Sequence, residues 1–472
     1  MARLRPVAVI SVLAGAMWLW IGHAFANYDA LYSLVWGRQI AHGHAPDYGV
    51  SLAPTPHPLA NLLGVVLSAF DGRTAEDVLV VIAFGALGAL GWVVYELGAH
   101  WFGWAAGLLA AAIVLTREPV ISYGVRAYVD VPYLALLLGA LLVEARRPRA
   151  GNPVLALLAV AGLIRPEAWL FSIAYLGYLV WADGWRWDLA VLAAAGPGLW
   201  LLSDLVLAGD ALHSLTGTRD NARQLHRVTG LVHVPTTLPR RVGEILREPV
   251  LVGAAGGGLL SLWLLRDRAR LPAIAGVLAV VAFAMMAAGG LPINTRYAFA
   301  IAALLAIFCG AGVFGWLALE AGHRWRRPWM AFAVLTVALL AGFGPSQLHR
   351  IDRTRHTLAT QQRIRDDLYA LLDTGALRRR HPPIGVVNHR LVPGVALVRG
   401  LDPAQVIPAP LPRGRDVPSA IWPRDATVAR QYVLDPRDPS RFVPGVPRGY
   451  RAIAGYRSWR LYTPASVFHG GE

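Results

Sequence analysis

The sequence predicts an all-α polytopic membrane protein with about eleven transmembrane helices, followed by a small α/β domain at the C-terminal end. Three observations support this class. Of the 472 residues, 56% are hydrophobic and only 15% are charged, and the mean hydropathy is +0.46. Apolar runs reach or approach the roughly 20 residues that cross a hydrocarbon core as a helix, and short charged connectors separate them. After residue 346 these runs stop, and arginine and proline become frequent.

The predicted spans follow one another from residue 6 onward. They cover residues 6–26, 77–98, 103–117, 131–145, 153–165, 168–182, 188–208, 249–265, 272–289, 297–319 and 329–346. Cys309 is the single cysteine and lies inside a span, which excludes an intrachain disulfide bond and a cysteine-based zinc site. Residues 1–26 also resemble a signal peptide, because an apolar centre precedes the small-residue sequence Ala-Phe-Ala. In either case the chain from residue 27 emerges on the outer side.

The arginines set the orientation, because cytoplasmic connectors carry the excess of positive charge. With the N-terminus in the cytoplasm, arginines gather in five cytoplasmic segments at residues 3–5, 146–149, 186, 266–270 and 324–327. The sequence therefore predicts a multi-pass protein of the cytoplasmic (inner) membrane whose C-terminal domain is extracytoplasmic. The net charge of +15 is then a topology signal, and we expect membrane lipids rather than nucleic acid as partners.

Two domains are predicted. The transmembrane domain covers residues 1–346 and carries large outer loops at 27–76 and 209–248. The extracytoplasmic α/β domain covers residues 347–472, about the usual size of a small domain. Within it, the pattern predicts an amphipathic helix and then strands, at 349–375, 384–389 and 394–398. The loop 209–248 also contains enough cationic side chains to line an anionic pocket: His213, Arg219, Arg223, His226, Arg227, His233, Arg240 and Arg241.

Two aspartates on separate outer segments are the candidate catalytic residues. Asp29 follows the first span, and Asp130 lies at the outer end of the fourth, where an ionisable group is expensive and is a functional candidate. Two such carboxylates could converge to activate an acceptor and hold a divalent metal ion, with Asp130 as its ligand. Each also has a structural alternative: Asp29 caps an interfacial helix that ends at Gly43, and Asp130 caps a helix with Pro132 in its first turn.

Arginines at the same predicted face are candidate phosphate ligands, because the guanidinium group binds phosphate in a forked geometry. Arg126 precedes Asp130 by one helical turn, Arg165 lies between two apolar runs, and Arg296 opens the tenth span. The alternative for Arg165 is an internal ion pair with Glu167 or a neighbour. For Arg296 the alternative is an extended side chain that reaches the interface.

These motifs together resemble the GT-C superfamily of membrane glycosyltransferases, which includes the protein O-mannosyltransferases and the lipid A aminoarabinose transferases. The resemblance covers about 300 residues of the membrane region. It rests on Asp29 after the first span, Thr-Pro-His-Pro-Leu around His57, Arg-Ala-Tyr-Val-Asp-Val-Pro-Tyr ending at residue 133, Leu-Ile-Arg-Pro-Glu ending at Glu167, and the Arg-Tyr pair that ends at Tyr297.

The resemblance implies inverting transfer of a sugar from a polyprenyl-phosphate donor, with Asp29 as the catalytic acid residue and Asp130 near the donor phosphate or a metal. Substrate contacts would come from Arg126, Arg165, Glu167, Arg296, Tyr297 and His57. Many members carry two consecutive acids after the first helix, whereas Asp29 is followed by Ala30. If the reaction needs a second acid in this outer loop, Asp47 is the early candidate for it.

The expected function is therefore a hexosyl- or pentosyltransferase that modifies a glycan, lipid or protein acceptor of the cell envelope at the outer face. A nucleotide-sugar donor is disfavoured, because the sequence has no Asp-x-Asp, Gly-x-Gly-x-x-Gly or Walker motif on the cytoplasmic side. The main alternative is a transporter or lipid-linked glycan flippase, for which Gly196-Pro197-Gly198, Glu96 and Asp204 are candidate elements within or near the spans. A third possibility is a scaffold that binds envelope polymers through the C-terminal domain.

Overall fold

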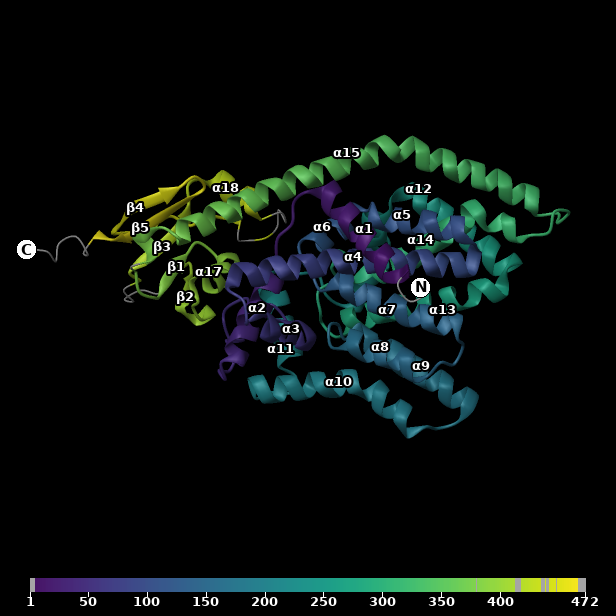
Figure 1. The fold of residues 1–472 in the computed structure, drawn as a ribbon, viewed down its shortest axis with the longest axis horizontal. Helices are drawn as coiled ribbons and strands as arrows, with labels where there is room; N and C mark the ends of the chain where they lie inside the picture. The colour runs from purple at the N-terminus through teal and green to yellow at the C-terminus, as the bar shows by residue number, and fades with distance from the viewer. Residues whose placement is uncertain are drawn as a thin grey trace, which may run out of the picture. The chain divides into compact units, whose positions relative to one another are not determined.

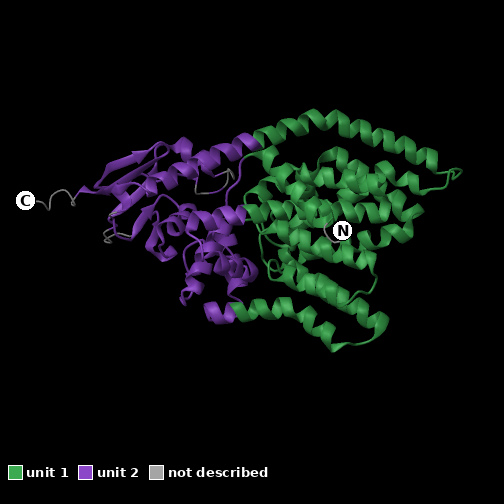
Figure 2. Cartoon of the chain, viewed as in Figure 1, with its two compact units in different colours: residues 1–22, 81–203, 226–354 green, residues 23–80, 204–225, 355–472 purple. Residues whose placement is uncertain are grey.

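The computed structural model describes residues 5–378, 380–411, 417–433, 438, 441–446 and 448–465. The described chain is mostly helical and contains one sheet (Figure 1). It divides into two compact units, each assembled from three stretches of sequence (Figure 2). Unit 1 contains residues 1–22, 81–203 and 226–354, and unit 2 contains residues 23–80, 204–225 and 355–472.

Each of the eleven predicted spans coincides with a helix. These helices are α1 (Arg5–Ile21), α4 (Gly72–Phe102), α5 (Trp104–Leu115), α7 (Asp130–Arg146), α8 (Asn152–Gly162), α9 (Glu167–Asp183), α10 (Trp187–Ala208), α12 (Val234–Leu264), α13 (Arg266–Ala288), α14 (Phe299–Phe314) and α15 (Arg326–Leu372). A further short helix, α6 (Glu118–Val125), follows α5 after a bend of 65°.

Six helical segments in the described chain are long and apolar enough to cross a membrane: α4, α10, α12, α13, α14 with its flanking 3₁₀ turns, and α15. The number is seven if α5 and α6 count as one broken span. The remaining helices are shorter than the usual spanning length. The structure therefore supports a multi-pass membrane protein, and the total of eleven spans stays a prediction.

Helix α14 with its flanking 3₁₀ turns is the centre of unit 1. In the most apolar 18-residue stretch of this segment, 83% of the residues are buried. Small residues allow close backbone contact on two sides of it. A Cβ atom added to Gly257 of α12 would lie 2.1 Å from the carbonyl oxygen of Phe308, and one added to Gly310 would lie 2.4 Å from that of Ala106 in α5. Contacts of this kind stabilise helix packing in lipid, where there is no hydrophobic force between helices.

Unit 2 contains the helices of the predicted outer loops and the C-terminal sheet. Its helices include α2 (Tyr28–Ala41), α3 (Pro58–Leu67), α11 (His213–Gln224), the C-terminal part of α15, α16 (Gly375–Arg378), α17 (Val392–Arg399) and α18 (Ala426–Tyr432). The sequence-based domain boundary at residues 346 and 347 lies inside α15, and the two predicted domains stay a prediction.

The sheet has the strand order β2-β1-β3-β5-β4. The strands are β1 (Ile384–Val386), β2 (Val406–Pro408), β3 (Ser419–Pro423), β4 (Tyr450–Tyr456) and β5 (Trp459–Pro464). Strand β1 is parallel to both β2 and β3, with Ile384 opposite Val406 on one side and Ser419 on the other. Strand β5 is antiparallel to β3 and to β4, which carries an irregularity between Ala452 and Ala454.

One predicted strand is wrong. Residues 394–398 belong to helix α17, whereas the predicted strand at 384–389 contains β1. Pro393 stands in the first turn of α17, and Gly400 ends it in the left-handed conformation at φ 65°. An apolar run this short does not distinguish a buried strand from a buried helix.

Helices α2 and α3 touch through their backbones at Gly37 and Gly64. A Cβ atom at Gly37 would lie 2.2 Å from the carbonyl carbon of Gly64. We expect Gly37→Ala to lower the free energy of unfolding by about 1–3 kcal/mol, as overpacking of a close contact does. A lower melting temperature of the purified protein would demonstrate this. The matched control is Gly217→Ala in α11, where a Cβ atom meets nothing within 4 Å; equal melting temperatures of the two variants would contradict the prediction.

Candidate functional site

Unit 1 brings together several of the residues that the sequence singles out. Asp130 is the first residue of α7, Arg165 lies in the turn between α8 and α9, and Glu167 begins α9. Arg296 and Tyr297 belong to the 3₁₀ turn η2 (Thr295–Ala298) that precedes α14. We call these five residues the polar cluster. Three turns at helix ends on the side predicted to be extracytoplasmic therefore meet at one place.

Arg165 joins the two acids of the polar cluster. Its Nη1 donates a hydrogen bond to Oδ1 of Asp130. Its Nε and Nη2 donate to Oε1 of Glu167 at 3.0 and 2.7 Å. The three side chains are almost fully buried, with 5%, 2% and 7% of Arg165, Asp130 and Glu167 exposed. A guanidinium group held in this way by two carboxylates has a fixed orientation, because its planar fork allows little rotation.

Arg296 completes the pairing of Asp130. Its Nη1 lies 3.5 Å from Oδ2 of that carboxylate, and its side chain is 19% exposed. The guanidinium of Arg165 lies over the ring of Tyr297, at 4.2 Å from its centre. Asp130 therefore holds two cations rather than capping helix α7, which has no side-chain cap. The ion pair expected between Arg165 and Glu167 is present, and Arg296 has a carboxylate neighbour instead of simply extending to an interface.

The ring of Tyr128 links Arg126 to Arg296 of the polar cluster. The guanidinium groups of Arg126 and Arg296 lie over the Tyr128 ring at 5.2 and 5.7 Å from its centre. Arg126 also donates to the carbonyl oxygen and the hydroxyl of Ser122, both at 2.8 Å. Cation–π contacts of this type allow two arginines to share one aromatic neighbour. Asp130 thus pairs with Arg165 and Arg296, and Arg126 shares the Tyr128 ring with Arg296.

A cavity of about 20 Å³ adjoins the polar cluster and is lined in part by Asp130, Glu167, Arg296 and Tyr297. This volume is enough for one water molecule. The buried Oε2 of Glu167 makes no hydrogen bond within the described chain. This oxygen can therefore accept a hydrogen bond from a molecule in the cavity.

The polar cluster does not fit a divalent metal ion well. Among the described residues, no group of three or more His, Cys, Asp or Glu side chains could hold one. Asp130 has two guanidinium groups as neighbours, and Arg165 stands between it and Glu167. Hard cations need several oxygen ligands and repel adjacent positive charge. The contacts of Asp130 therefore do not support the predicted role as a metal ligand.

Asp29 belongs to unit 2, in the first turn of α2. The cap of this helix is Asn27, whose side-chain oxygen accepts from the backbone N–H of Asp29 at 2.7 Å and of Ala30 at 3.3 Å. The N-cap of α2 is therefore Asn27 and not Asp29. The neighbouring Tyr28 donates to the carbonyl oxygen of Leu52 at 2.6 Å. Burial holds the pKa of the Tyr28 hydroxyl well above its ordinary value.

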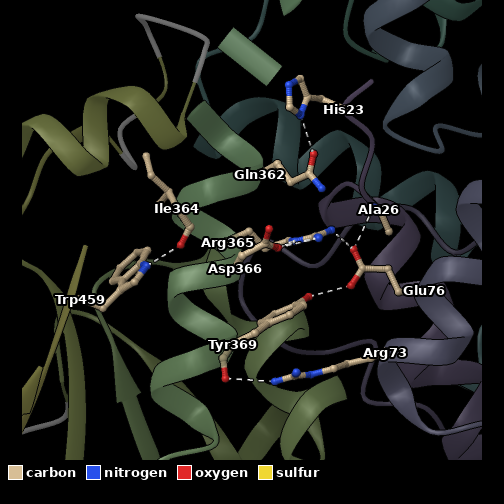
Figure 3. A network of polar contacts seen from close by, with 10 residues as sticks. All are labelled: His23, Ala26, Arg73, Glu76, Gln362, Ile364, Arg365, Asp366, Tyr369 and Trp459. Atoms are coloured by element: carbon tan, nitrogen blue, oxygen red, sulfur yellow. Dashed lines mark hydrogen bonds and ion pairs between the residues drawn. The ribbon is translucent and has the colours of Figure 1, made fainter. Parts of the chain in front are cut away.

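A buried carboxylate, Glu76, holds the chain just before Asn27 (Figure 3). Its Oε1 accepts from the backbone N–H of Ala26 at 3.0 Å and also binds Arg365. Its Oε2 accepts from the hydroxyl of Tyr369 at 2.9 Å. Arg365 and Tyr369 lie in the C-terminal part of α15, so this network fastens the entry into α2 to a long helix (Figure 3).

The other early candidates in unit 2 have structural contacts. Oδ2 of Asp47 accepts from the backbone N–H of Ala404 at 3.1 Å, and its own N–H donates to Gln39. His57 is half-buried and directly precedes α3, without capping it by a side-chain hydrogen bond. The contacts of Asp47 favour a role in holding the 3₁₀ turn at Pro403–Gln405 rather than a second catalytic acid.

Sequence reasoning missed three residues that position the candidates: Asn27, Glu76 and Tyr128. Asn27 carries a recognisable signal, because asparagine two residues before an aspartate at the start of an apolar run is typical of a helix N-cap. Glu76 carries none, since its partner Arg365 is distant in sequence. Tyr128 stands inside the Arg-Ala-Tyr-Val-Asp-Val-Pro-Tyr motif, but it contacts the arginines only through its ring face.

Comparisons with known proteins agree with this architecture. No protein-family model and no curated protein matches the sequence. Among solved structures, the chain resembles ArnT from Cupriavidus metallidurans bound to undecaprenyl phosphate, with a TM-score of 0.55 and 14% identity over 97% of this chain and 98% of that one. The apo state of the same protein gives a TM-score of 0.54 with complete coverage of both chains. The chain has the GT-C fold.

A further GT-C structure is more distant. It is the archaeal oligosaccharyltransferase AglB from Archaeoglobus fulgidus, in complex with an inhibitory peptide and a dolichol-phosphate. It has a TM-score of 0.47 and 13% identity, over 86% of this chain and 65% of that one. The fold expected from the short motifs of the membrane region is thus confirmed by the ArnT structures, whose match extends over the C-terminal sheet as well.

Proposed function

We propose that this protein is an integral membrane glycosyltransferase that transfers a sugar from a polyprenyl-phosphate donor to a cell-envelope acceptor on the extracytoplasmic face. The observation that carries the proposal is the fold, which the chain shares over 97% of its length with ArnT, a protein crystallised with undecaprenyl phosphate. Such a reaction needs a base for the acceptor, a cationic environment for the departing phosphate and a hydrophobic surround for the donor lipid.

The proposal assigns these roles to particular side chains. The acceptor hydroxyl oxygen forms a bond to the anomeric carbon of the sugar while the bond from that carbon to the phosphate oxygen breaks, with inversion. The acceptor proton passes to a carboxylate base, for which Asp29 is the candidate that the sequence resemblance gives, and the electron pair stays on the lipid phosphate. Arg126, Arg165 and Arg296 stabilise the negative charge that develops there, and Asp130 keeps Arg165 and Arg296 in place.

Specific contacts argue against the transporter alternative. Transport sites usually keep polar groups near the bilayer midplane in broken helices. Glu96 instead pairs with Arg146, and Asp204 accepts from the backbone N–H and hydroxyl of Ser214 at 2.9 and 2.7 Å. Helix α10 continues through Pro197 without interruption. The acids that suggested a transport path therefore support the fold.

The proposal is tested with purified protein, membrane lipid extracts that carry a radiolabelled sugar on polyprenyl phosphate, and an envelope fraction as acceptor. We expect the label to move to the acceptor from the lipid-linked sugar. A nucleotide sugar supplied alone should give no labelled acceptor, because it is not the donor. Label that crosses the membrane of a proteoliposome without reaching an acceptor would instead support a flippase and overturn the proposal.

A further inference from the structure

A second cavity in unit 1, of about 450 Å³, shares no lining residue with the small cavity of the polar cluster. We call it the arginine cavity. It is lined by the C-terminal ends of α1 and α5 and by middle segments of α12 and α15, all at the side predicted to be extracytoplasmic. Its walls divide into two kinds. The apolar wall includes Trp20, Leu109, Ile113, Leu340 and Phe343, and the polar wall includes Arg117, Arg247 and Arg350.

Arg117 places a buried positive charge in the polar wall. The residue is 9% exposed, and its guanidinium donates to the carbonyl oxygens of Ile113 and Leu246 at 3.1 and 3.2 Å. Its other hydrogen bond goes to the hydroxyl of Thr116. These neutral acceptors orient the guanidinium but leave its charge uncompensated, which is costly for a buried group unless an anion lies beside it.

Arg350 adds a second positive charge without a neutralising partner. It lies on α15, half-buried in the wall of the arginine cavity. Within the part of the chain that the structure describes, it makes no hydrogen bond or ion pair. A half-buried guanidinium with all its donors available is suited to bind a ligand with several acceptor oxygens.

Arg247 is held in a strained backbone conformation at the same cavity. Its φ of 68° and ψ of 164° interrupt helix α12, in a region of backbone space that is almost restricted to glycine. Its side chain pairs with Glu118 at 3.2 Å. Strain of this kind persists only where the surrounding structure holds it, and strained residues cluster at functional and ligand-binding sites.

We propose that the arginine cavity binds an anionic phospholipid, with the phosphodiester headgroup against Arg117, Arg247 and Arg350 and an acyl chain along the apolar wall. The charges favour a singly charged headgroup. Arg247 pairs with Glu118, and Glu248 also lines the cavity, so the formal charges of the three arginines and two glutamates sum to one positive charge, which matches a phosphodiester rather than a doubly charged phosphate monoester. Basic pockets between membrane helices are a known way to bind lipid headgroups.

The inference does not depend on the proposed function, because it concerns lipid binding and not sugar transfer. The test is native mass spectrometry of the full-length protein in detergent, titrated separately with phosphatidylglycerol, phosphatidylcholine and undecaprenyl phosphate. We expect tighter binding of phosphatidylglycerol than of the other two lipids. Arg350→Gln and Arg247→Gly should each weaken that binding by about 10- to 100-fold, the effect of losing a charged hydrogen bond.

Arg247→Gly separates binding from folding. Glycine adopts the backbone conformation of Arg247 without strain, so the melting temperature of the lipid-free variant should not fall below that of wild type. The matched control is Arg457→Gly, which replaces an exposed arginine at φ 42° in the turn between β4 and β5 and should leave lipid binding unchanged. Equal binding of phosphatidylcholine, a preference for undecaprenyl phosphate, or unchanged binding by Arg247→Gly would overturn the proposal.

Discussion

Replacement of Asp29 by asparagine is expected to reduce sugar transfer by about 10²- to 10⁴-fold, the range that a general base contributes. Asparagine keeps the size of the side chain but cannot accept the proton of the acceptor hydroxyl. The measurement is the rate of label transfer from polyprenyl-phosphate sugar, at matched amounts of purified protein. This prediction follows from the proposed function and from the position of Asp29 in the first turn of α2.

Asparagine keeps the backbone contacts that Asp29 makes at the start of α2. The first turn of α2 is capped by the side chain of Asn27, and Asp29 contributes its backbone N–H to that cap. Its carbonyl oxygen accepts from Ser33 at 3.4 Å. None of these contacts uses the carboxylate, so they survive the substitution. Asn27→Ala removes the side-chain cap of α2 and should lower the free energy of unfolding by about 0.5–2 kcal/mol.

The matched control for Asp29→Asn is Asp77→Asn. Asp77 is an exposed acid in unit 2 for which the proposal has no role, so transfer should stay at the wild-type rate. If Asp29→Asn retained full activity, the base would have to be another residue. If both variants lost activity equally, a general effect of removing negative charge from unit 2 would explain the result.

The membrane class could be predicted from the sequence because lipid imposes one rule on every spanning segment. Backbone groups without water must bond within a helix, so each long apolar run forms one. The exception is the end of α15, where the structure continues to Leu372 although the apolar run stops near residue 346. The change from apolar to polar residues marks a change of environment and does not by itself end a helix.

The polar cluster could be predicted in part. An acid and an arginine next to apolar spans attract attention because ionisable groups are expensive there. The alternation of spans then places Asp130, Arg165 and Arg296 on one side, and the structure brings these three together. Their pairing could not be predicted, because Asp130 and Arg165 are 35 residues apart and their contact depends on how α7, α8 and α9 pack.

Arg165→Met is expected to lower the free energy of unfolding by about 3–5 kcal/mol, the cost of removing one partner from a buried ion pair. Methionine fills similar space but leaves Asp130 and Glu167 buried without the guanidinium that joins them. Thermal and denaturant unfolding of the purified protein would measure the loss. The control is Arg186→Met, which removes an exposed pair with Asp188 and should leave stability nearly unchanged.

A triple variant separates the structural role of the polar cluster from its role in transfer. Replacing Arg165, Asp130 and Glu167 together by methionine and two leucines removes the charges as a set, and such replacements are often neutral or stabilising. We expect this variant to regain most of the stability that Arg165→Met loses and still to transfer no sugar, because the phosphate would have lost its arginine environment. A stable triple variant with wild-type transfer would mean that the cluster serves only to pack α7, α8 and α9, and that the lipid phosphate is bound by other residues.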